Sequence, residues 1–288
     1  MEIHIEDGLE KSRYQQHIET VTEQFSPLPD PFVFLVYEDP DSPENVIGTT
    51  DIQPRSLLEE ACRRKSSSSF TVNDIDIIII RIDDPFLKDN DDALKGLIAH
   101  EVIHAVHRET GLEEEIEDAS TQYSDLVLNR LANYEMTKDE AIDFLRDVVS
   151  TAVFCLKDIH ANTDIIEAGF GDELAEYYYH QLGIDSYCPL PRFYQDETSI
   201  TQIKEAVAFE LQLTPAWLPF KKHDNERAKR MQEQIEECYE LNIPETAKAI
   251  HGICSLYEQA YDDDRFIESF YDTLFEEIFD LVDLKLQD

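Results

Sequence analysis

The sequence predicts an α+β protein in which a small sheet precedes one motif-bearing helix and a mostly helical remainder. Two apolar, β-branched runs, at 31–40 and about 75–82, have the composition of strands. From residue 112 onward, apolar residues recur at helical spacing almost without a break. Between these regions lies the segment 97–110, LIAHEVIHAVHRET, which contains three histidines and a glutamate.

The elements of the first part follow in order. PFVFLVYEDP (31–40) is bracketed by prolines and predicts a strand, and SLLEEACRRK (56–65) predicts a short helix with a serine-rich loop after it. The run IDIIIIRI (75–82) predicts a second, strong strand. The helix that follows begins among aspartates, which suit the positive end of a helix dipole. It ends at Gly111, because glycine readily adopts the left-handed conformation that ends a helix.

The rest of the chain is predicted to be helical. EEEIEDASTQYSDLVLNRLANYE, TKDEAIDFLRDVVSTAVFCLKDIHANTDII and GDELAEYYYHQLG each have apolar residues at helical spacing. Four more helices and no strand are expected between about 197 and 286. The proline-containing segment YCPLPRFY (187–194) separates the two groups. We therefore predict a domain over 1–186 that contains the motif helix, followed by a helical C-terminal extension over 187–288.

The charge of the chain excludes two classes of partner. There are 63 Asp and Glu against 24 Lys and Arg, a formal net charge of −39. Such a surface repels nucleic acid phosphates and anionic membranes, so neither is expected to bind. The acidic residues are spread over every segment, which indicates that the whole surface is adapted to concentrated salt, as in the cytoplasm of a halophilic archaeon.

Cysteine usage and the N-terminal sequence indicate a soluble cytoplasmic protein. No two of the five cysteines form a C-x-x-C pair, which disfavours a zinc ribbon or a disulfide framework and favours reduced thiols. The first residues have neither a basic start nor an apolar run, so no signal peptide is expected. The most apolar stretch, 75–82, is too short to cross a bilayer.

The segment 97–110 contains the pattern His-Glu-x-x-His. Residues four apart lie on one face of a helix, so His100 and His104 can present two imidazoles to one metal ion. Glu101 lies beside them and can take a proton from a metal-activated water molecule. The other faces of the helix are apolar, and buried imidazoles that point together need a common partner, which a metal ion supplies. The alternative is two core histidines that are hydrogen-bonded to carboxylates.

A strong strand followed by an HExxH helix resembles the zincin-like peptidases, over roughly residues 30 to 180. His107 stands where the metzincin pattern has glycine, so the resemblance is to the gluzincin type. In gluzincins the third zinc ligand is a glutamate on a later helix, often in an E-x-x-A-D frame. DIHAN (158–162) fits that frame with Asp158 for Glu and Asn162 for Asp. The resemblance therefore implies Asp158 as the third metal ligand and Asn162 as the support of a ligand histidine.

Other residues remain candidates near this site. Glu117, Asp118 and His160 are alternatives for the third ligand. His107 is expected to be exposed to solvent or to hydrogen-bond a metal ligand without binding the metal itself. The run 177–180, YYYH, has residue types that can donate a hydrogen bond to an oxyanion, although such aromatic runs are typically packing residues. KDIHAN and GDEL are similar to segments of uncharacterised haloarchaeal HExxH proteins, which implies a zinc peptidase of unknown substrate.

Together these features predict a cytoplasmic zinc-dependent metallopeptidase that hydrolyses peptide or protein substrates. His100, His104 and Asp158 would bind Zn²⁺, and Glu101 would polarise the attacking water and pass its proton to the leaving amine. The alternative is a non-catalytic helical interaction or regulatory protein with a structural or vestigial metal site, because the C-terminal helices have no evident catalytic task. The role of Glu101 distinguishes the peptidase from the non-catalytic protein, because a structural metal site needs no general base.

Overall fold

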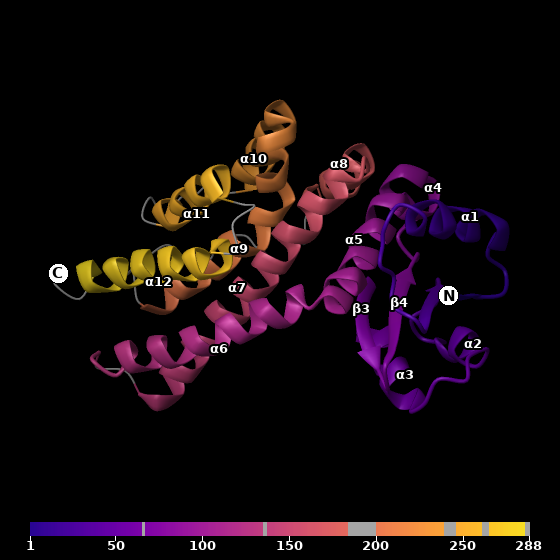
Figure 1. The fold of residues 1–288 in the computed structure, drawn as a ribbon, viewed down its shortest axis with the longest axis horizontal. Helices are drawn as coiled ribbons and strands as arrows, with labels where there is room; N and C mark the ends of the chain where they lie inside the picture. The colour runs from indigo at the N-terminus through magenta and orange to yellow at the C-terminus, as the bar shows by residue number, and fades with distance from the viewer. Residues whose placement is uncertain (65–66, 135–136, 184–199, 239–245, 261–264, 286–288) are drawn as a thin grey trace. The chain divides into compact units, whose positions relative to one another are not determined.

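The fold is that of a computed structural model, shown in Figure 1. The structure describes the chain except for residues 65–66, 135–136, 184–199, 239–245, 261–264 and 286–288. A small mixed sheet in the N-terminal part is followed by a mostly helical remainder, so the predicted α+β class is confirmed.

The sheet has four strands in the order β1-β2-β4-β3: β1 (Glu2–Ile5), β2 (Phe32–Tyr37), β3 (Ser67–Val72) and β4 (Ile75–Arg81). β1 pairs parallel with β2, and β2 pairs parallel with β4, whereas β3 pairs antiparallel with β4. The turn between β3 and β4 places Asn73 and Asp74 at φ 50° and 62°, the left-handed region that Asn and Asp tolerate better than most residues.

The two predicted strands are confirmed as β2 and β4. The prediction of a loop over the serines is wrong for Ser67–Ser69, which belong to β3 and pair with Ile78–Ile80. Serine has little preference for strands, so this strand depends on the backbone partners that β4 offers and on the packing of Phe70 and Val72. No strand was predicted for the residues of β1.

Short helices connect the strands: α1 (Lys11–Thr22), α2 (Glu44–Ile47) and α3 (Arg55–Arg64). A fourth, α4 (Pro85–Asp89), lies between β4 and the next helix. α1 provides the crossover that two parallel strands require. On one face of the sheet, Leu35 and Ile79 pack with Leu58 and Cys62 of α3. The hydroxyl of Tyr37 in β2 donates to the carbonyl oxygen of Cys62 at 2.6 Å, which fixes α3 to the sheet.

The motif helix α5 (Asp91–Thr110) begins and ends as predicted. The side chain of Asn90 caps its start by accepting from the backbone N–H groups of residues 92 and 93. Gly111 ends it with φ 82°. Near its C-terminal end, Arg108 donates to Asp76 of β4 at 2.9 Å. Arg108 therefore fixes the end of α5 to the strand that precedes it.

Seven further helices follow: α6 (Leu112–Leu131), α7 (Lys138–Glu167), α8 (Gly171–Leu182), α9 (Ile200–His223), α10 (Asn225–Cys238), α11 (Thr246–Ala260) and α12 (Phe266–Lys285). The last four are the helices predicted for the C-terminal part, and the described residues there include no strand. Among the described helices, none combines the length and the apolar composition that crossing a membrane requires.

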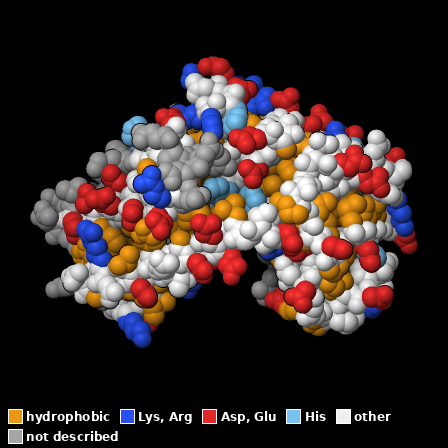
Figure 2. Space-filling model, in the orientation of Figure 1, with side chains coloured by type: hydrophobic (Ala, Val, Ile, Leu, Met, Phe, Trp, Pro, Cys, Tyr) orange, Lys and Arg blue, Asp and Glu red, His pale blue; other side chains and the backbone are white. Residues whose placement is uncertain are grey.

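The chain divides into two compact units. Unit 1 comprises 1–112 and 161–181, and unit 2 comprises 113–160 and 182–288, so that α7 belongs partly to each. Unit 2 has an aromatic core that includes Phe266, Phe270 and Tyr271. The predicted boundary between 186 and 187 lies outside the described residues and stays a prediction. In the face shown in Figure 2, Asp and Glu side chains are scattered over both units.

Candidate metal centre

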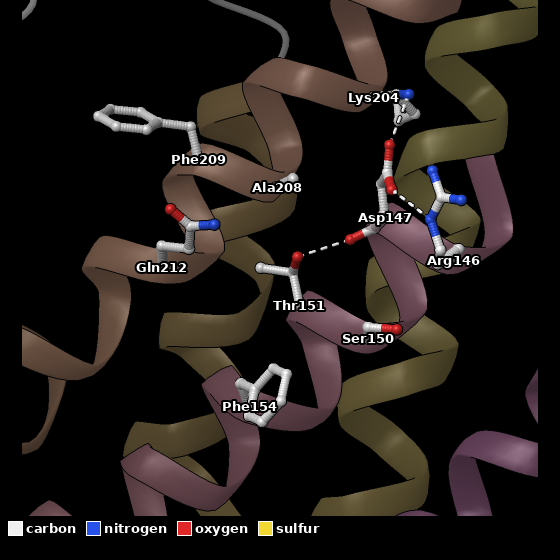
Figure 3. Close-up of a pocket in the computed structure, with 9 residues that line it drawn as sticks. All are labelled: Arg146, Asp147, Ser150, Thr151, Phe154, Lys204, Ala208, Phe209 and Gln212. Carbon is white, nitrogen blue, oxygen red and sulfur yellow. Dashed lines mark hydrogen bonds and ion pairs between the residues drawn. The ribbon is translucent and has the colours of Figure 1, made fainter. Parts of the chain in front are cut away.

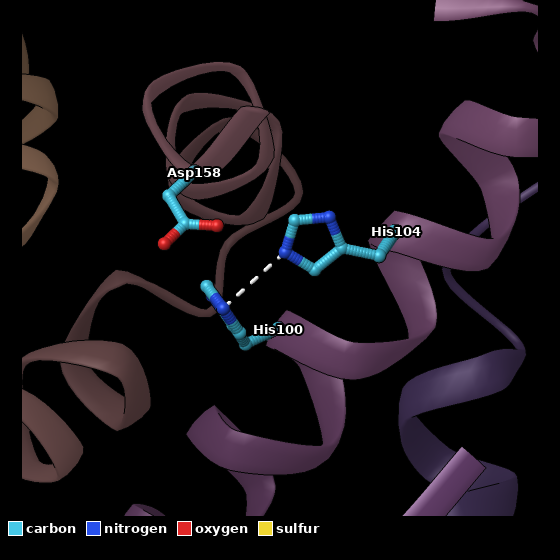
Figure 4. A group of neighbouring side chains, drawn as sticks. All are labelled: His100, His104 and Asp158. Atoms are coloured by element: carbon cyan, nitrogen blue, oxygen red, sulfur yellow. Dashed lines mark hydrogen bonds between the residues drawn. The ribbon is translucent and has the colours of Figure 1, made fainter. Parts of the chain in front are cut away.

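The Nε2 atoms of the two motif histidines face each other. His100 and His104 lie one turn apart on α5, and both are partly buried. Their Nε2 atoms are 3.3 Å apart, and the ring planes are inclined at 82°. The i, i+4 spacing therefore brings two potential metal-ligand atoms together, as the sequence predicts (Figure 4).

Asn162 orients the first of these histidines. It lies in the C-terminal part of α7 and is fully buried. Its Oδ1 accepts a hydrogen bond from Nδ1 of His100 at 3.0 Å, and its Nδ2 donates to the hydroxyl of Tyr178 at 2.7 Å. With the proton on Nδ1, a neutral His100 carries its lone pair on Nε2, the nitrogen that faces His104. This contact is the one that the sequence predicts for Asn162.

Asp158 lies on the same helix, one turn before Asn162. Helical spacing puts the two side chains on one face of α7. A carboxylate oxygen of Asp158 and the ligand nitrogens of His100 and His104 all lie within 4.8 Å of one another. Figure 4 shows the carboxylate directed toward the two imidazoles. The structure therefore brings together the three residues predicted to bind the metal.

The alternative third ligands make other contacts. Glu117 binds the ammonium group of Lys157 at 2.6 Å, and its side chain is 61% exposed. Asp118 is exposed on α6. The ring of His160 packs edge-on against Phe266 of α12, with ring centroids 5.7 Å apart. These contacts favour Asp158 as the partner of the two histidines.

Glu101 and His107 are both buried residues of α5. Glu101, the predicted general base, is 7% exposed. His107 is 3% exposed, and its Nε2 lies 2.7 Å from a carboxylate oxygen of Asp164 on α7. Of the two roles predicted for His107, exposure is therefore wrong, because Asp164 of α7 lies against its buried ring, whereas support of a metal ligand stays a prediction. His107 is instead a second link between α5 and α7.

α8 supplies a residue that the sequence did not single out. Tyr178 is the hydrogen-bond partner of Asn162, whereas His180 binds Asp84 and stacks on Phe86 with ring centroids 4.0 Å apart. α8 lies close to α5 at Gly96. A Cβ at this position would be 2.3 Å from a backbone oxygen of Glu173, so the approach requires glycine. The signal in the sequence was the run YYYH, but which tyrosine faces Asn162 depends on the packing of α8.

A buried thiol, that of Cys155, also lies on α7. It lies on α7 near Asp158 and is fully buried. Burial raises the pKa of its thiol well above the usual value, and the negative charge of Asp158 raises this pKa further. Cys155 therefore remains a neutral thiol, as do the buried, unoxidised Cys62 and Cys254.

Unit 2 contains a separate cavity of about 500 Å³, lined by residues of α7 and α9 (Figure 3). Its two cationic groups are already paired, because Lys204 and Arg146 both contact the carboxylate of Asp147, at 2.7 and 3.2 Å. The rest of the lining includes Phe154 and Phe209. None of the predicted site residues lies there, and we assign this cavity no ligand.

Comparisons with known proteins add no information about this site. No family model matches the chain, and searches of curated proteins and of solved structures also find no match. A function assigned to this chain therefore rests on its own residues and their geometry.

Proposed function

We propose that this protein is a zinc-dependent peptidase in which His100, His104 and Asp158 hold the metal. The observation that supports this most directly is the 3.3 Å separation of the two Nε2 atoms. Two nitrogens that each lie about 2.0–2.1 Å from one tetrahedral zinc ion are about 3.3–3.4 Å from each other. The same two nitrogens are also within hydrogen-bonding distance of each other.

The donor set also fits zinc chemically. Two imidazole nitrogens and one carboxylate are a common ligand set of catalytic zinc, and three protein ligands leave a fourth position for water or substrate. The hydrogen bond from His100 to Asn162 favours the tautomer that a metal at Nε2 requires. Asp158 adds a negative charge that partly compensates the charge of the cation. These features support a catalytic rather than a fully coordinated structural site.

The proposed reaction gives each charged group one role. A bound zinc ion supplies a Lewis acid that lowers the pKa of a water molecule to about 7. The carboxylate of Glu101 accepts the proton of the attacking water and then delivers it to the nitrogen of the leaving amine. Because Glu101 is buried, few bulk water molecules compete for this proton transfer.

The proposal is tested by removing and restoring the metal. The zinc-loaded protein is incubated with a mixture of unstructured peptides in a high-salt buffer, which screens the repulsion within a chain of net charge −39. We expect cleavage that a zinc chelator abolishes and that added zinc restores, with products identified by mass spectrometry. Magnesium should not restore cleavage, because it binds poorly to imidazole nitrogens. Zinc-loaded protein that cleaves no peptide would contradict the proposal and favour a structural metal.

Asp158→Ala should weaken zinc binding by about 100-fold or more, since it removes a direct ligand and its charge. The affinity is measured by competition with a chromophoric chelator. Glu117→Ala is the matched control, because Glu117 is a carboxylate one helix away that contacts Lys157 instead of the histidines. Its zinc affinity should equal that of the unmodified protein. An unchanged affinity in Asp158→Ala would exclude Asp158 from the ligand set and leave the two histidines in place.

A further inference from the structure

Two side-chain contacts join the C-terminal part of α7 to the motif helix α5 within unit 1. Oδ1 of Asn162 lies 3.0 Å from Nδ1 of His100. A carboxylate oxygen of Asp164 lies 2.7 Å from Nε2 of His107. We propose that Asp164 is a positioning residue, because its hydrogen bond with His107 sets the rotation of this part of α7 and so keeps Asn162 in place. The consequence for metal binding rests on the proposed function, whereas the position of Asn162 does not.

The spacing of these residues differs between the two helices. His100 and His107 are seven residues apart on α5, which places them on one face, about 10 Å apart along the helix axis. Asn162 and Asp164 are two residues apart on α7, so their side chains leave that helix in nearly opposite directions, about 200° apart. The two contacts therefore hold α7 from opposite sides. A rotation of α7 about its own axis, in either direction, would lengthen one of them.

The apolar residues of this part of the chain constrain the rotation only weakly. Ala161 and Ile165 are fully buried, and the ring of Phe170, just after α7, stacks on that of Phe25, with centroids 6.1 Å apart. Apolar burial is non-directional, whereas a hydrogen bond weakens steeply when its angle is poor. The apolar contacts therefore attach α7 to unit 1, and the polar contacts select its rotation. For the same reason, a variant that lacks the carboxylate of Asp164 should still fold.

Among the described residues, Asp164 is the only hydrogen-bond partner of the His107 ring. His107 is 3% exposed, and its Nδ1 is buried without a partner. The distance of 2.7 Å at Nε2 is at the short end for N–H···O contacts, as is typical of charge-assisted hydrogen bonds. Because an ionised carboxylate only accepts, Nε2 of His107 carries the proton. Removal of the carboxylate leaves a buried imidazole without a protein partner, which favours a movement of the helix.

The first test measures hydrogen exchange of the side-chain amide of Asn162 by NMR in the metal-free protein. We expect this buried amide to exchange at least about tenfold faster in Asp164→Ala, because local opening of α7 exposes it to water. Asp164→Asn retains an acceptor for Nε2 of His107, so its rate should stay within about threefold of that of the unmodified protein. An unchanged rate in Asp164→Ala, or equal acceleration by both substitutions, would overturn the proposal.

Two controls separate local opening from general destabilisation. Asp143→Ala removes an exposed carboxylate from the N-terminal half of α7, where it pairs with Arg146. This change should leave the exchange of the Asn162 amide unaltered. The backbone amides of β4 should exchange at the same rate in Asp164→Ala as in the unmodified protein. Equal acceleration at β4 and at Asn162 would indicate global destabilisation and overturn the proposal.

The second test measures zinc affinity and the free energy of unfolding in the same variants. Asp164→Ala should weaken zinc binding by about tenfold, the low end of the range for residues that orient a metal ligand, and Asp164→Asn by less than about threefold. Because Asp164 acts through His107, adding Asp164→Ala to His107→Ala should cause no further loss of affinity. A loss of stability in Asp164→Ala at unchanged zinc affinity would assign the pair a purely structural role. If the unmodified protein binds no zinc, the proposed function fails, and the exchange of the Asn162 amide alone decides the role of Asp164.

Discussion

Protein purified without chelator is expected to contain close to one zinc ion per chain, and His104→Ala is expected to contain almost none. The Nε2 atoms of the two histidines are 3.3 Å apart, so removal of one imidazole would leave the proposed ligand set incomplete. We expect the zinc affinity to fall by at least about 1,000-fold, because a direct ligand contributes more than the 10- to 100-fold of a residue that only orients one. Metal content is measured by elemental mass spectrometry.

His251→Ala is the control for this experiment. His251 is an exposed histidine of α11 in unit 2, so its loss should leave the zinc content unchanged. Circular dichroism in high salt shows whether each variant is folded. Folded, unmodified protein that contains no zinc and does not take up added zinc would refute the proposed metal site.

Glu101→Gln should retain zinc but lose at least two orders of magnitude in kcat/KM for peptide hydrolysis. The substitution preserves the size and shape of the side chain, whereas an amide does not accept the proton of the attacking water. General-base catalysis contributes about 10²–10⁴ in rate, which sets the expected size of the loss. The measurement is the rate of cleavage of a peptide identified in the metal-restoration experiment, at equal zinc occupancy.

Glu109→Gln is a matched control on the same helix. Glu109 is exposed, so this change should leave both zinc content and activity unaltered. Equal activity in Glu101→Gln and the unmodified protein would place the base elsewhere. Loss of zinc together with activity would show that Glu101 maintains the site instead of transferring a proton.

The motif helix could be predicted from the sequence because its signals are local. The aspartates at its start, the stop at Gly111 and the spacing of His100 and His104 all lie within one continuous segment. The buried strands β2 and β4 were similarly clear from their β-branched and aromatic residues. Each of these elements is specified by residues close together in the chain, so neither the beginning nor the end of α5 required knowledge of its neighbours.

Features that depend on distant partners could not be predicted in this way. Ser67–Ser69 form a strand because β4 pairs with them, and serines alone do not indicate a strand. The hydrogen bond of Tyr178 depends on the close approach of α8 to α5 at Gly96. His107 is buried because the C-terminal part of α7 covers it, a contact that its position near the end of α5 does not reveal.

The assignment of Asp158 as a metal ligand draws both on a local sequence pattern and on contacts between residues far apart in the chain. The resemblance to the gluzincin frame favoured this residue, but helical spacing alone could not separate it from the other carboxylates of an acidic chain. The contacts of α6 distinguish them, because Glu117 is paired with Lys157. The hydrogen bond between Asn162 and His100 adds a second constraint, since Asp158 lies one turn away from Asn162 on the same face of α7.

The division of unit 1 into two stretches has a consequence for the order of events during translation. Chains begin to fold from the N-terminus as they leave the ribosome. The sheet and α5 emerge first, and the ribosome then makes residues 113–160, which belong to unit 2. During that interval His100 and His104 have been synthesised, but Asn162 and Tyr178 have not. A nascent chain therefore presents the histidine pair before Asn162 is made, and the hydrogen-bonded series of His100, Asn162 and Tyr178 forms only after α8 has left the ribosome.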